Sequence, residues 1–317
     1  MKKKINIVNF DPYLYSKNLK PQWKKYGKYI EVKKNTPLDS YFKIVDIAIV
    51  RFTINFDQKT IEKCKNLKII ATNATGLNHI DQLSAKKNNI KIISLKNEKL
   101  FLKEITSTAE HTWALLLAFE KNIFQSINHV KENNWNRNMF LGRSLFSKKI
   151  GIFGFGRNGK IINKFAKAFG MKVKSLDINK VSNNLIFPND LEIFLKDLDY
   201  LILTLPLNSL TNKIINKNIL NLLHKDCVLI NTSRGEIVDE KHLLMALKSN
   251  KIRGYATDVI TDEFNYKKNK MIEYSKKNAN VIITPHLGGA SIDSWQKTEE
   301  FIHNKTIKYL EKMDLNK

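Results

Sequence analysis

The chain has 317 residues, a length that suits two domains of ordinary size, each able to bury its own core. No stretch approaches 18 uninterrupted apolar residues, which excludes a membrane-spanning helix. The formal net charge is +24, yet only six of the 54 basic residues are arginines, and the lysines are spread along the whole chain. This spread favours lysine-rich solvated faces over a polyanion site, so we expect neither a nucleic-acid nor a membrane partner.

The N-terminus and the cysteines indicate a cytoplasmic protein. The opening residues MKKKINIVNF are basic but run directly into a strand pattern, without the apolar core and the small-residue cleavage site of a signal peptide. Cys64 and Cys227 lie far apart in apolar settings, without the spacing of metal ligands. We therefore expect both to be reduced core residues, and we expect no metal site.

The first hundred residues alternate short apolar runs with polar segments of helical character. The expected strands are Ile5–Phe10, Val45–Val50, Leu67–Thr72 and Ile90–Leu95, and the expected helices lie near residues 12–27, 57–65 and 79–88. Strands that alternate with helices predict a parallel sheet with helices on both faces. This unit contains no glycine-rich phosphate loop.

A long helix is expected to begin near Ser107. The sequence Ser107-Thr108-Ala109-Glu110 has the spacing of a capping box, and the following HTWALLLAFEKNIF is apolar on nearly every side. We expect such a helix to be buried between domains or between subunits. A polar segment of little periodicity, about residues 131–148, follows it.

Residues Lys149–Asp177 contain a motif that the rest of the chain supports. The apolar run Ile150–Phe153 predicts a buried strand, an amphipathic helix ending at Gly170 follows, and Met171–Leu176 predicts a second strand. Between the first strand and the helix stand Gly154, Gly156 and Gly159, with the spacing G-x-G-x-x-G.

Each of these three glycines has a mechanical role in a dinucleotide site. Gly154 makes the tight turn, Gly156 lets the backbone approach a pyrophosphate, and Gly159 lets helix and strand pack closely. The first N–H groups of the helix then face the phosphates. Asp177 would accept hydrogen bonds from an adenosine ribose and repel a 2′-phosphate, so we expect NAD, with NADP less favoured. Lys180, close behind, keeps NADP open.

Later strands end in residues that could carry chemistry. The expected strands are Tyr200–Leu205, Val228–Thr232, Tyr255–Val259 and Val281–Thr284, with a helix near 239–250 and apolar residues at helical spacing in 291–315. After three of these strands come Arg234, then Asp258 with Asp262 and Glu263, then His286. Ligands of open α/β sheets bind beyond the carboxyl ends of the strands, so an arginine, an acid and a histidine should converge near a nicotinamide.

This trio suits hydride transfer to a 2-keto acid. Arg234 could hold the substrate carboxylate and carbonyl, and His286 could donate a proton to the forming alkoxide. Glu263 behind the imidazole would fix its tautomer and favour its protonated form. Taken singly, each residue also has an ordinary explanation: His286 could cap a strand, Arg234 could lie in a solvated turn, and Glu263 could be an exposed charge. The remaining histidines lack such a setting and are expected on the surface or in helices: His79, His111, His129, His224, His242 and His303.

Seven motifs in order resemble the D-isomer-specific 2-hydroxyacid dehydrogenases over nearly the whole chain. They are ATGLNHID (74–81), AEHTWALLLA (109–118), GIFGFGRNGK (151–160), LILTLPLNSLT (201–211), INTSRGEIVDE (230–240), ATDVITDE (256–263) and TPHLGGAS (284–291). The family's catalytic Arg, Glu and His match Arg234, Glu263 and His286. The resemblance implies an α/β protein of two doubly wound parallel-sheet domains: a flavodoxin-like substrate-binding domain (1–105 with 291–317) and a Rossmann NAD-binding domain (106–290).

The resemblance also implies individual ligand contacts. Backbone N–H groups at Thr75 and Gly76 would hold the substrate carboxylate, with Arg51 nearby and with Arg234 and His286 completing the substrate site. Arg157 and Asn158 would contact the pyrophosphate, and Asp258 the carboxamide of the nicotinamide. Further cofactor contacts are expected at Thr204, Pro206, Thr211 and Thr232. The family resemblance further implies that the C-terminal helix packs back on the first domain and that the 107–125 helix forms a dimer core.

Three details bear on the branch of the family. The family usually has Glu-Pro where this chain has Glu263-Phe264, so Asp262 could compete for the role of Glu263. The residues FTINF after Arg51 do not reproduce the phosphate-binding pattern of the phosphoglycerate members. The sequence ATGLN at 74–78 is more similar to the glycerate and hydroxypyruvate reductases, and the acid at position 263 differs from the glutamine of formate dehydrogenases.

We therefore predict an NAD-dependent D-2-hydroxyacid dehydrogenase, homodimeric, with its active site in an interdomain cleft. Hydroxypyruvate or glyoxylate is the leading substrate. One alternative is a D-3-phosphoglycerate dehydrogenase, and another, of a different class, is a non-catalytic NAD(H)-sensing binding protein.

Overall fold

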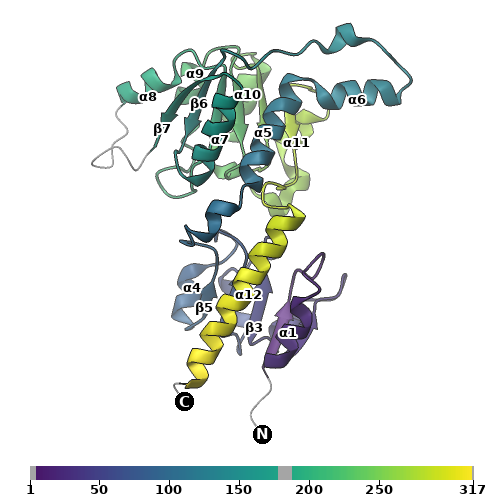
Figure 1. The fold of residues 1–317 in the computed structure, drawn as a ribbon, viewed down its shortest axis with the longest axis vertical. Helices are drawn as coiled ribbons and strands as arrows, with labels where there is room; N and C mark the ends of the chain where they lie inside the picture. Colours follow the sequence, from purple (N-terminus) through teal and green to yellow (C-terminus); the bar gives the residue numbers. More distant parts are fainter. Residues whose placement is uncertain (1–4, 178–187, 316–317) are drawn as a thin grey trace. The chain divides into compact units, whose positions relative to one another are not determined.

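The computed structural model describes residues 5–177 and 188–315. The chain forms two compact units, Met1–Glu104 with Ser291–Lys317 (unit 1) and Ile105–Ala290 (unit 2). Lys180, which left the choice between NAD and NADP open, lies outside the described residues. Both units are α/β structures around a parallel sheet (Figure 1).

Unit 1 contains a five-stranded parallel sheet in the order β2-β1-β3-β4-β5. The strands are β1 (Asn6–Asn9), β2 (Lys28–Glu31), β3 (Ile47–Val50), β4 (Ile69–Thr72) and β5 (Lys91–Ile93). Strands β3 and β4 are buried along their whole length, as expected of central strands covered on both faces. All but β2 lie inside the predicted ranges. Strand β2, with the sequence KYIE at the sheet edge, lacks a continuous apolar run and was missed.

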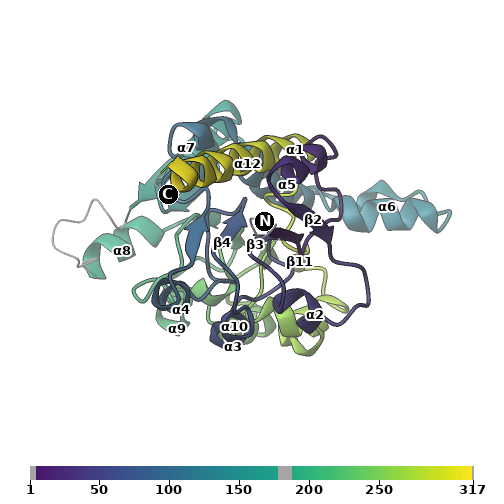
Figure 2. The ribbon, with the colours of Figure 1, turned by 90° about the horizontal axis from the view of Figure 1, so that it is seen from below.

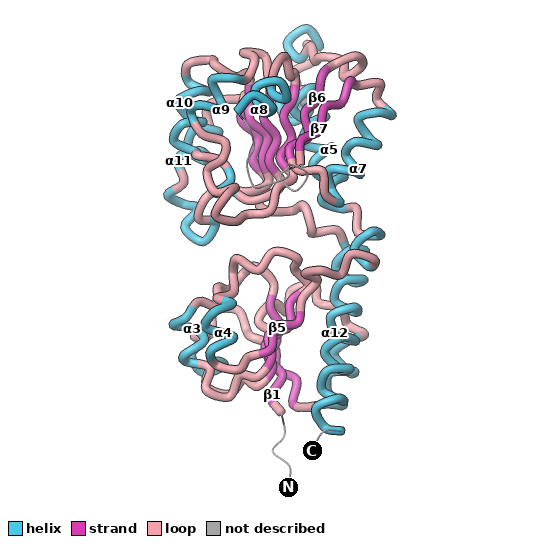
Figure 3. Tube along the Cα trace, turned by 90° about the vertical axis from the view of Figure 1, so that its left-hand side faces the viewer, coloured by secondary structure: helices cyan, strands magenta, loops and turns pink. Residues whose placement is uncertain are grey.

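Helices cover both faces of this sheet (Figure 3). On one face α12 (Ile292–Leu315) packs on β4 and β5, with α1 (Leu19–Tyr26) beside it (Figure 2). The ring of Trp23 on α1 meets the ring of His303 on α12 edge-on, with centroids 4.4 Å apart. The other elements are α2 (Asp39–Phe42), α3 (Gln58–Lys63), α4 (Gln82–Lys87) and the 3₁₀ turn η1 (Phe101–Glu104). The one-turn helix α2 was not predicted.

Unit 2 contains a six-stranded parallel sheet in the order β11-β10-β9-β8-β6-β7. The strands are β6 (Lys149–Phe153), β7 (Lys172–Leu176), β8 (Tyr200–Leu203), β9 (Val228–Asn231), β10 (Gly254–Thr257) and β11 (Val281–Ile283). The chain reverses its winding direction beside β6, between β7 and β8. Because the glycine-rich loop follows β6, this loop lies where such sheets bind ligands.

Helices lie on both faces of the unit 2 sheet (Figure 3), and each face has its own apolar core. Helices α5 (Ser107–Glu120) and α7 (Arg157–Ala168) cover one face. The other face carries α8 (Pro188–Leu195), α9 (Lys217–Leu222), α10 (Glu240–Lys248) and α11 (Lys270–Ser275). The remaining elements are α6 (Ile123–Lys131) and the 3₁₀ turns η2 (Arg137–Phe140), η4 (Gly235–Ile237) and η5 (Glu263–Lys268).

The long helix predicted from Ser107 is two helices. Helix α5 ends at Glu120, and Asn122, in the left-handed region with φ +50°, separates it from α6. The capping box at Ser107 is also wrong, since Thr106 is the N-cap residue and its hydroxyl contacts Glu110. Helix α5 is buried, but against α7, β9 and β10 of its own unit. Its all-round apolar character is therefore explained within unit 2.

Helix α6 and the segment after it leave apolar side chains exposed. None of the α6 residues is buried, and the helix stands away from the sheet of unit 2 (Figure 1). The exposed large apolar side chains here are Ile123, Phe124, Ile127, Val130, Trp135, Met139, Leu141 and Phe146. Among the described residues, no helix is long and apolar enough to cross a membrane.

Candidate active site

The glycine-rich turn between β6 and α7 has the geometry that its spacing predicts. Gly154 has a φ of +99°, which a residue with a side chain rarely adopts. A Cβ on Gly159 would lie 2.3 Å from the carbonyl oxygen of Gly154, so only glycine allows this close packing of helix on turn. A Cβ on Gly156 would meet nothing within 4 Å, which leaves open space beside the backbone there.

This turn suits the pyrophosphate of a dinucleotide. Gly156 is the N-cap residue of α7 and offers no side chain to satisfy the first N–H groups of the helix. At the end of β7, a carboxylate oxygen of Asp177 accepts a hydrogen bond from the N–H of Phe155 within the turn, at 3.1 Å. The acid is thus held beside the glycine turn, where an adenosine ribose would need it.

The other residues predicted to contact the cofactor differ in their surroundings. The Thr204 hydroxyl lies against the carbonyl of Gly154, and the Arg157 guanidinium donates to the carbonyl of Ile105. Burial lowers the pKa of Arg157. Thr211 is fully buried and its hydroxyl donates to the carbonyl of Pro206 at 2.6 Å, so this side chain stabilises the loop after β8.

At the carboxyl ends of β9, β10 and β11, hydrogen bonds link the loops that follow these strands. The N–H of Asp258 donates to the carbonyl of Asn231, and the N–H of Thr284 to that of Thr257. The N–H of His286 donates to the carbonyl of Asp258 at 2.9 Å. Three loops distant in sequence are therefore fixed relative to one another at the edge of the sheet.

Within this edge, His286 pairs with Glu263. Nδ1 of the imidazole lies 2.7 Å from Oε2 of Glu263, and the His286 side chain is 23% exposed. Asp262, the predicted competitor, instead accepts a hydrogen bond from Asn265 at 2.8 Å. The structure therefore pairs His286 with Glu263 and not with Asp262, even though Phe264 stands where the family usually has proline.

Arg234 belongs to the same cluster. Burial lowers the pKa of its guanidinium, while the nearby carboxylates of Glu263 and Glu236 act in the opposite direction. Nη1 donates to the carbonyl of Ser233 at 2.6 Å. Gly235 is required next to it, because a Cβ there would lie 1.9 Å from the backbone carbon of Ile260. The loop carrying Arg234 is thus pressed against the loop that leads to Glu263.

Asp258 is the most highly connected side chain at this edge, and sequence reasoning missed one of its partners. The carboxylate is 1% exposed and accepts hydrogen bonds from Thr284 (2.5 Å) and from the N–H groups of Leu287 (2.7 Å) and Gly288 (2.6 Å). Nε2 of His111, on α5, lies 3.1 Å from Oδ1 of Asp258. Burial raises the pKa of Asp258, but these hydrogen bonds outweigh burial and lower it overall.

His111 was expected to be an ordinary surface or helix residue. It lies in the second turn of α5 and contacts Thr284 Oγ1 at 2.9 Å as well as Asp258. No sequence signal links it to residues 147 or more positions away. The nearest hint was its place inside the AEHTW motif. Two other histidines of that group, His79 and His303, are buried.

The backbone of His286 is itself in an uncommon conformation. Its φ is +56°, in the left-handed region. For a residue other than glycine this costs about 1–3 kcal/mol, and it persists only where surrounding contacts impose it. The bonds from the backbone around His286 to Asp258 are such contacts.

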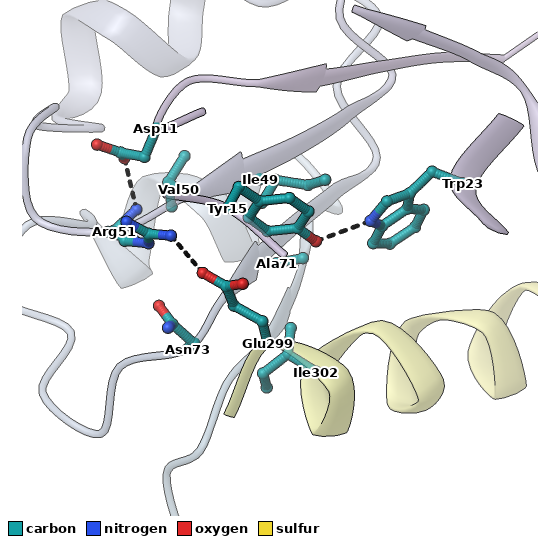
Figure 4. A pocket seen from close by; sticks show the side chains of 10 residues that line it. All are labelled: Asp11, Tyr15, Trp23, Ile49, Val50, Arg51, Ala71, Asn73, Glu299 and Ile302. Carbon is teal, nitrogen blue, oxygen red and sulfur yellow. Dashed lines mark hydrogen bonds and ion pairs between the residues drawn. The ribbon is translucent and has the colours of Figure 1, made fainter. Parts of the chain in front are cut away.

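The residues predicted to bind substrate in unit 1 follow β3 and β4. Thr75 is exposed and Gly76 half-buried in the loop after β4. Arg51 follows β3 directly, and its guanidinium is paired with Glu299 of α12 (Figure 4). The guanidinium also donates to the carbonyl of Tyr13 and stacks 4.2 Å above the Trp295 ring. The side chains of Arg51 and Glu299 are only 12% and 3% exposed.

The family model of the D-isomer specific 2-hydroxyacid dehydrogenase NAD-binding domain matches residues 113–288. The chain is 31% identical over 280 residues to a glyoxylate reductase of Pyrococcus furiosus, covering 84% of this chain and 80% of that one. It is 34% identical over 271 residues to a D-3-phosphoglycerate dehydrogenase of Methanocaldococcus jannaschii, covering 84% of this chain but 50% of the relative. A structure of Aquifex aeolicus D-lactate dehydrogenase with NAD and lactic acid superposes with a TM-score of 0.81, at 27% identity over 98% of this chain and 96% of that one.

The fold and the site thus define an oxidoreductase with a dinucleotide-binding unit. The chain belongs to the D-isomer specific 2-hydroxyacid dehydrogenases, which use NAD. The predicted family, fold class, enzyme class and cofactor are confirmed.

Proposed function

We propose that this protein reduces small, unphosphorylated 2-keto acids such as glyoxylate or hydroxypyruvate to the corresponding 2-hydroxy acids, in the D configuration where the product is chiral. The observation that carries the proposal is the His286–Glu263 pair, 2.7 Å apart, in a cluster with the half-buried Arg234. A histidine backed by a carboxylate and accompanied by an arginine is the set of groups that proton donation to a carboxylate-bearing carbonyl compound requires.

Each of the three side chains has a distinct task. Arg234 holds the substrate through its carboxylate and carbonyl oxygens, for which the guanidinium fork is suited. With Nδ1 of His286 directed at Glu263, Nε2 carries the proton that passes to the forming alkoxide. Glu263 stabilises the charged imidazole and fixes which nitrogen faces the substrate.

The residues around the glycine turn would hold NAD. Gly154, Gly156, Gly159 and the start of α7, with Arg157 and Asn158, form the pyrophosphate site, and Asp177 receives the ribose. Thr204, Pro206, Thr211 and Thr232 shape the loops beside it. When bound, NADH supplies the hydride for the carbonyl carbon. A 2′-phosphate beside Asp177 would meet a like charge, which favours NADH over NADPH.

The surroundings of Arg51 support a small substrate over a phosphorylated one. Its guanidinium is already paired with the buried Glu299, and the carboxylate of Asp11 accepts the N–H of Arg51 at 2.7 Å (Figure 4). The cavity lined by these residues has a volume of about 10 Å³, enough for roughly one water molecule. A phosphate dianion would meet two carboxylates and no room at this position.

A substrate panel tests the proposal. Glyoxylate, hydroxypyruvate, pyruvate and 3-phosphohydroxypyruvate are each supplied with NADH and with NADPH, and the loss of nicotinamide absorbance is followed. We expect the highest kcat/KM for glyoxylate or hydroxypyruvate with NADH. Preference for the phosphorylated acid would favour the phosphoglycerate alternative. Tight NADH binding without turnover of any acid would favour an NAD(H)-sensing binding protein.

Glu263→Gln should lower kcat for keto-acid reduction. The amide keeps the size of the side chain but carries no charge with which to stabilise the imidazole as it holds the proton that it donates. We expect kcat to fall and KM to change less, because Arg234 still holds the substrate. A kcat equal to that of the wild type would contradict the role given to Glu263. Glu273→Gln, on exposed α11, is the matched control.

The exposed apolar face of α6 and the segment after it supports a homodimer in which this face is buried. A contiguous exposed apolar surface of this kind is typical of an interface. Within the predicted dimer helix, α6 leaves the large apolar side chains exposed, since those of α5 pack mostly within its own unit.

Ile127→Glu is expected to convert the dimer into a monomer, because a charge would be buried in the interface. Light scattering coupled to size-exclusion chromatography should give twice the chain mass of 36.8 kDa for the wild type and the single mass for the variant. Ile193→Glu changes an isoleucine on α8 that is even more exposed (68% against 46% for Ile127) and should stay dimeric. A dimeric Ile127→Glu protein would rule this interface out.

Two further proposals concern the cellular location of the protein and the role of unit 1. Cys64 and Cys227 are buried and unbridged, and burial raises the pKa of the Cys64 thiol to about 12. Unbridged buried thiols are typical of a reducing compartment, which supports a cytoplasmic location. We also propose that unit 1 is the substrate-binding domain, with α12 as its C-terminal helix.

A further inference from the structure

The turn that carries His286 follows β11, and a side chain of helix α5, that of His111, contacts it from one side. Residues 284–288 surround the carboxylate of Asp258, which receives Thr284 Oγ1 and the N–H groups of Leu287 and Gly288. His111 of α5 contacts both Asp258 Oδ1 (3.1 Å) and Thr284 Oγ1 (2.9 Å) through Nε2. The buried carboxylate therefore has donors from α5, from β11 and from the turn itself.

This network accounts for the uncommon backbone of His286. A residue with φ +56° needs contacts on both sides to stay in that conformation. The N–H of His286 is fixed to the carbonyl of Asp258, and the next two N–H groups are fixed to the carboxylate of the same residue. The position of the imidazole thus depends on where the Asp258 carboxylate stands.

His111 determines that position from the helix side. Because Asp258 is 1% exposed, water cannot replace a lost donor without entering the packed edge. Helix α5 is in turn anchored on β9 and β10, and the adjacent Thr112 hydroxyl contacts that of Thr232 at 2.7 Å. The helix is thus a rigid support from which a donor can be aimed at Asp258.

We propose that His111 is a positioning residue which, through Asp258 and Thr284, fixes the turn carrying His286. It acts by keeping Nδ1 of His286 aligned with Glu263. Asp258 is the acceptor around which the turn closes. This inference rests on the proposed role of His286 in keto-acid reduction.

Two substitutions at position 111 separate positioning from folding. His111→Leu fills similar space without a donor, whereas the amide nitrogen of His111→Gln can take the place of Nε2. For His111→Leu we expect kcat to fall about ten- to a hundredfold, since a misplacement of about 1 Å costs this much, with smaller changes in KM. His111→Gln should recover most of the loss. His129→Leu, on α6, is the control and should match the wild type.

The imidazole itself reports on the effect without any substrate. In nitrogen-15 spectra of the full-length protein, the His286 ring signals should shift in His111→Leu and return towards the wild type in His111→Gln. Thr284→Val should produce the same shift, and the double variant less than the sum of both, because the two share one acceptor. NADH binding should change little, and the melting temperature, although lowered by the missing donor to the buried carboxylate, should stay well above the assay temperature.

Unaltered His286 signals and unaltered kcat in His111→Leu would overturn the proposal. So would a loss of kcat that His111→Gln does not recover, or one that follows the loss of melting temperature. If the wild type reduced no keto acid, the proposed function would fail, whereas the ring signals would still decide whether His111 positions His286.

Discussion

Replacing His286 with alanine is expected to lower kcat for keto-acid reduction by about 10²–10⁴-fold, the usual contribution of a positioned proton donor. The reason lies in the geometry of the imidazole, which Glu263 holds through Nδ1 at 2.7 Å. Without the ring, the alkoxide must take its proton from water. Substrate and NADH should still bind, because Arg234 and the glycine turn are unchanged. Steady-state kinetics with the best substrate of the panel measures this loss.

The matched control is His224→Ala, which removes a half-exposed histidine of the same unit. It should leave kcat unchanged. NADH affinity, followed by quenching of tryptophan fluorescence, should stay within about twofold of the wild type in both variants, because neither histidine belongs to the glycine turn. If His286→Ala turned over at the wild-type rate, another group would have to donate the proton, and the site assignment would be wrong.

Arg234→Ala is expected to impair keto-acid reduction about as strongly as His286→Ala, but by raising KM as well as lowering kcat. Hydrogen bonds to charged groups contribute about 1.5–3 kcal/mol each, so losing a two-pronged contact should lower kcat/KM by about 10²–10⁴-fold. The truncation also leaves Glu263 without the neighbouring positive charge. Michaelis–Menten analysis over a wide substrate range separates the two parameters.

Arg234→Lys tests whether the planar fork or only the charge is needed. Lysine keeps the charge but presents a single point donor, so we expect it to recover a small part of the lost kcat/KM. Arg137→Ala, which removes an exposed arginine, is the control and should behave as the wild type. Full activity of Arg234→Lys would indicate that charge alone suffices and that the two-pronged contact is not formed.

Much of the fold could be read from local patterns. Strands β3 and β8 are apolar throughout, and β4, β6 and β9 have a single polar residue at one end, because strands buried on both faces need no polar side. The elements that were missed have weaker local signals. Strand β2 is a half-exposed edge strand, and the break between α5 and α6 depends on one asparagine in a left-handed conformation. Apolar residues on both sides of that break hid the helix end.

That Arg234, Glu263 and His286 come close together could be predicted from the sequence for a topological reason. Parallel strands bring their carboxyl ends to one edge, so residues following β9, β10 and β11 had to come close together. The same rule could not choose between Asp262 and Glu263. That choice depends on side-chain direction in the loop, where Asp262 turns towards Asn265.

What the sequence determined by itself is the order of elements, the glycine turn and the set of residues at the ends of the strands, because these follow from spacing along one chain. Only the tertiary structure joined His111 to Asp258 and paired Arg51 with Glu299, since each pair combines residues from elements far apart in the chain. Whether a charged side chain is available to a ligand depends on whether it is already paired with another group of the protein. Packing in three dimensions decides that partner, and no local pattern encodes it.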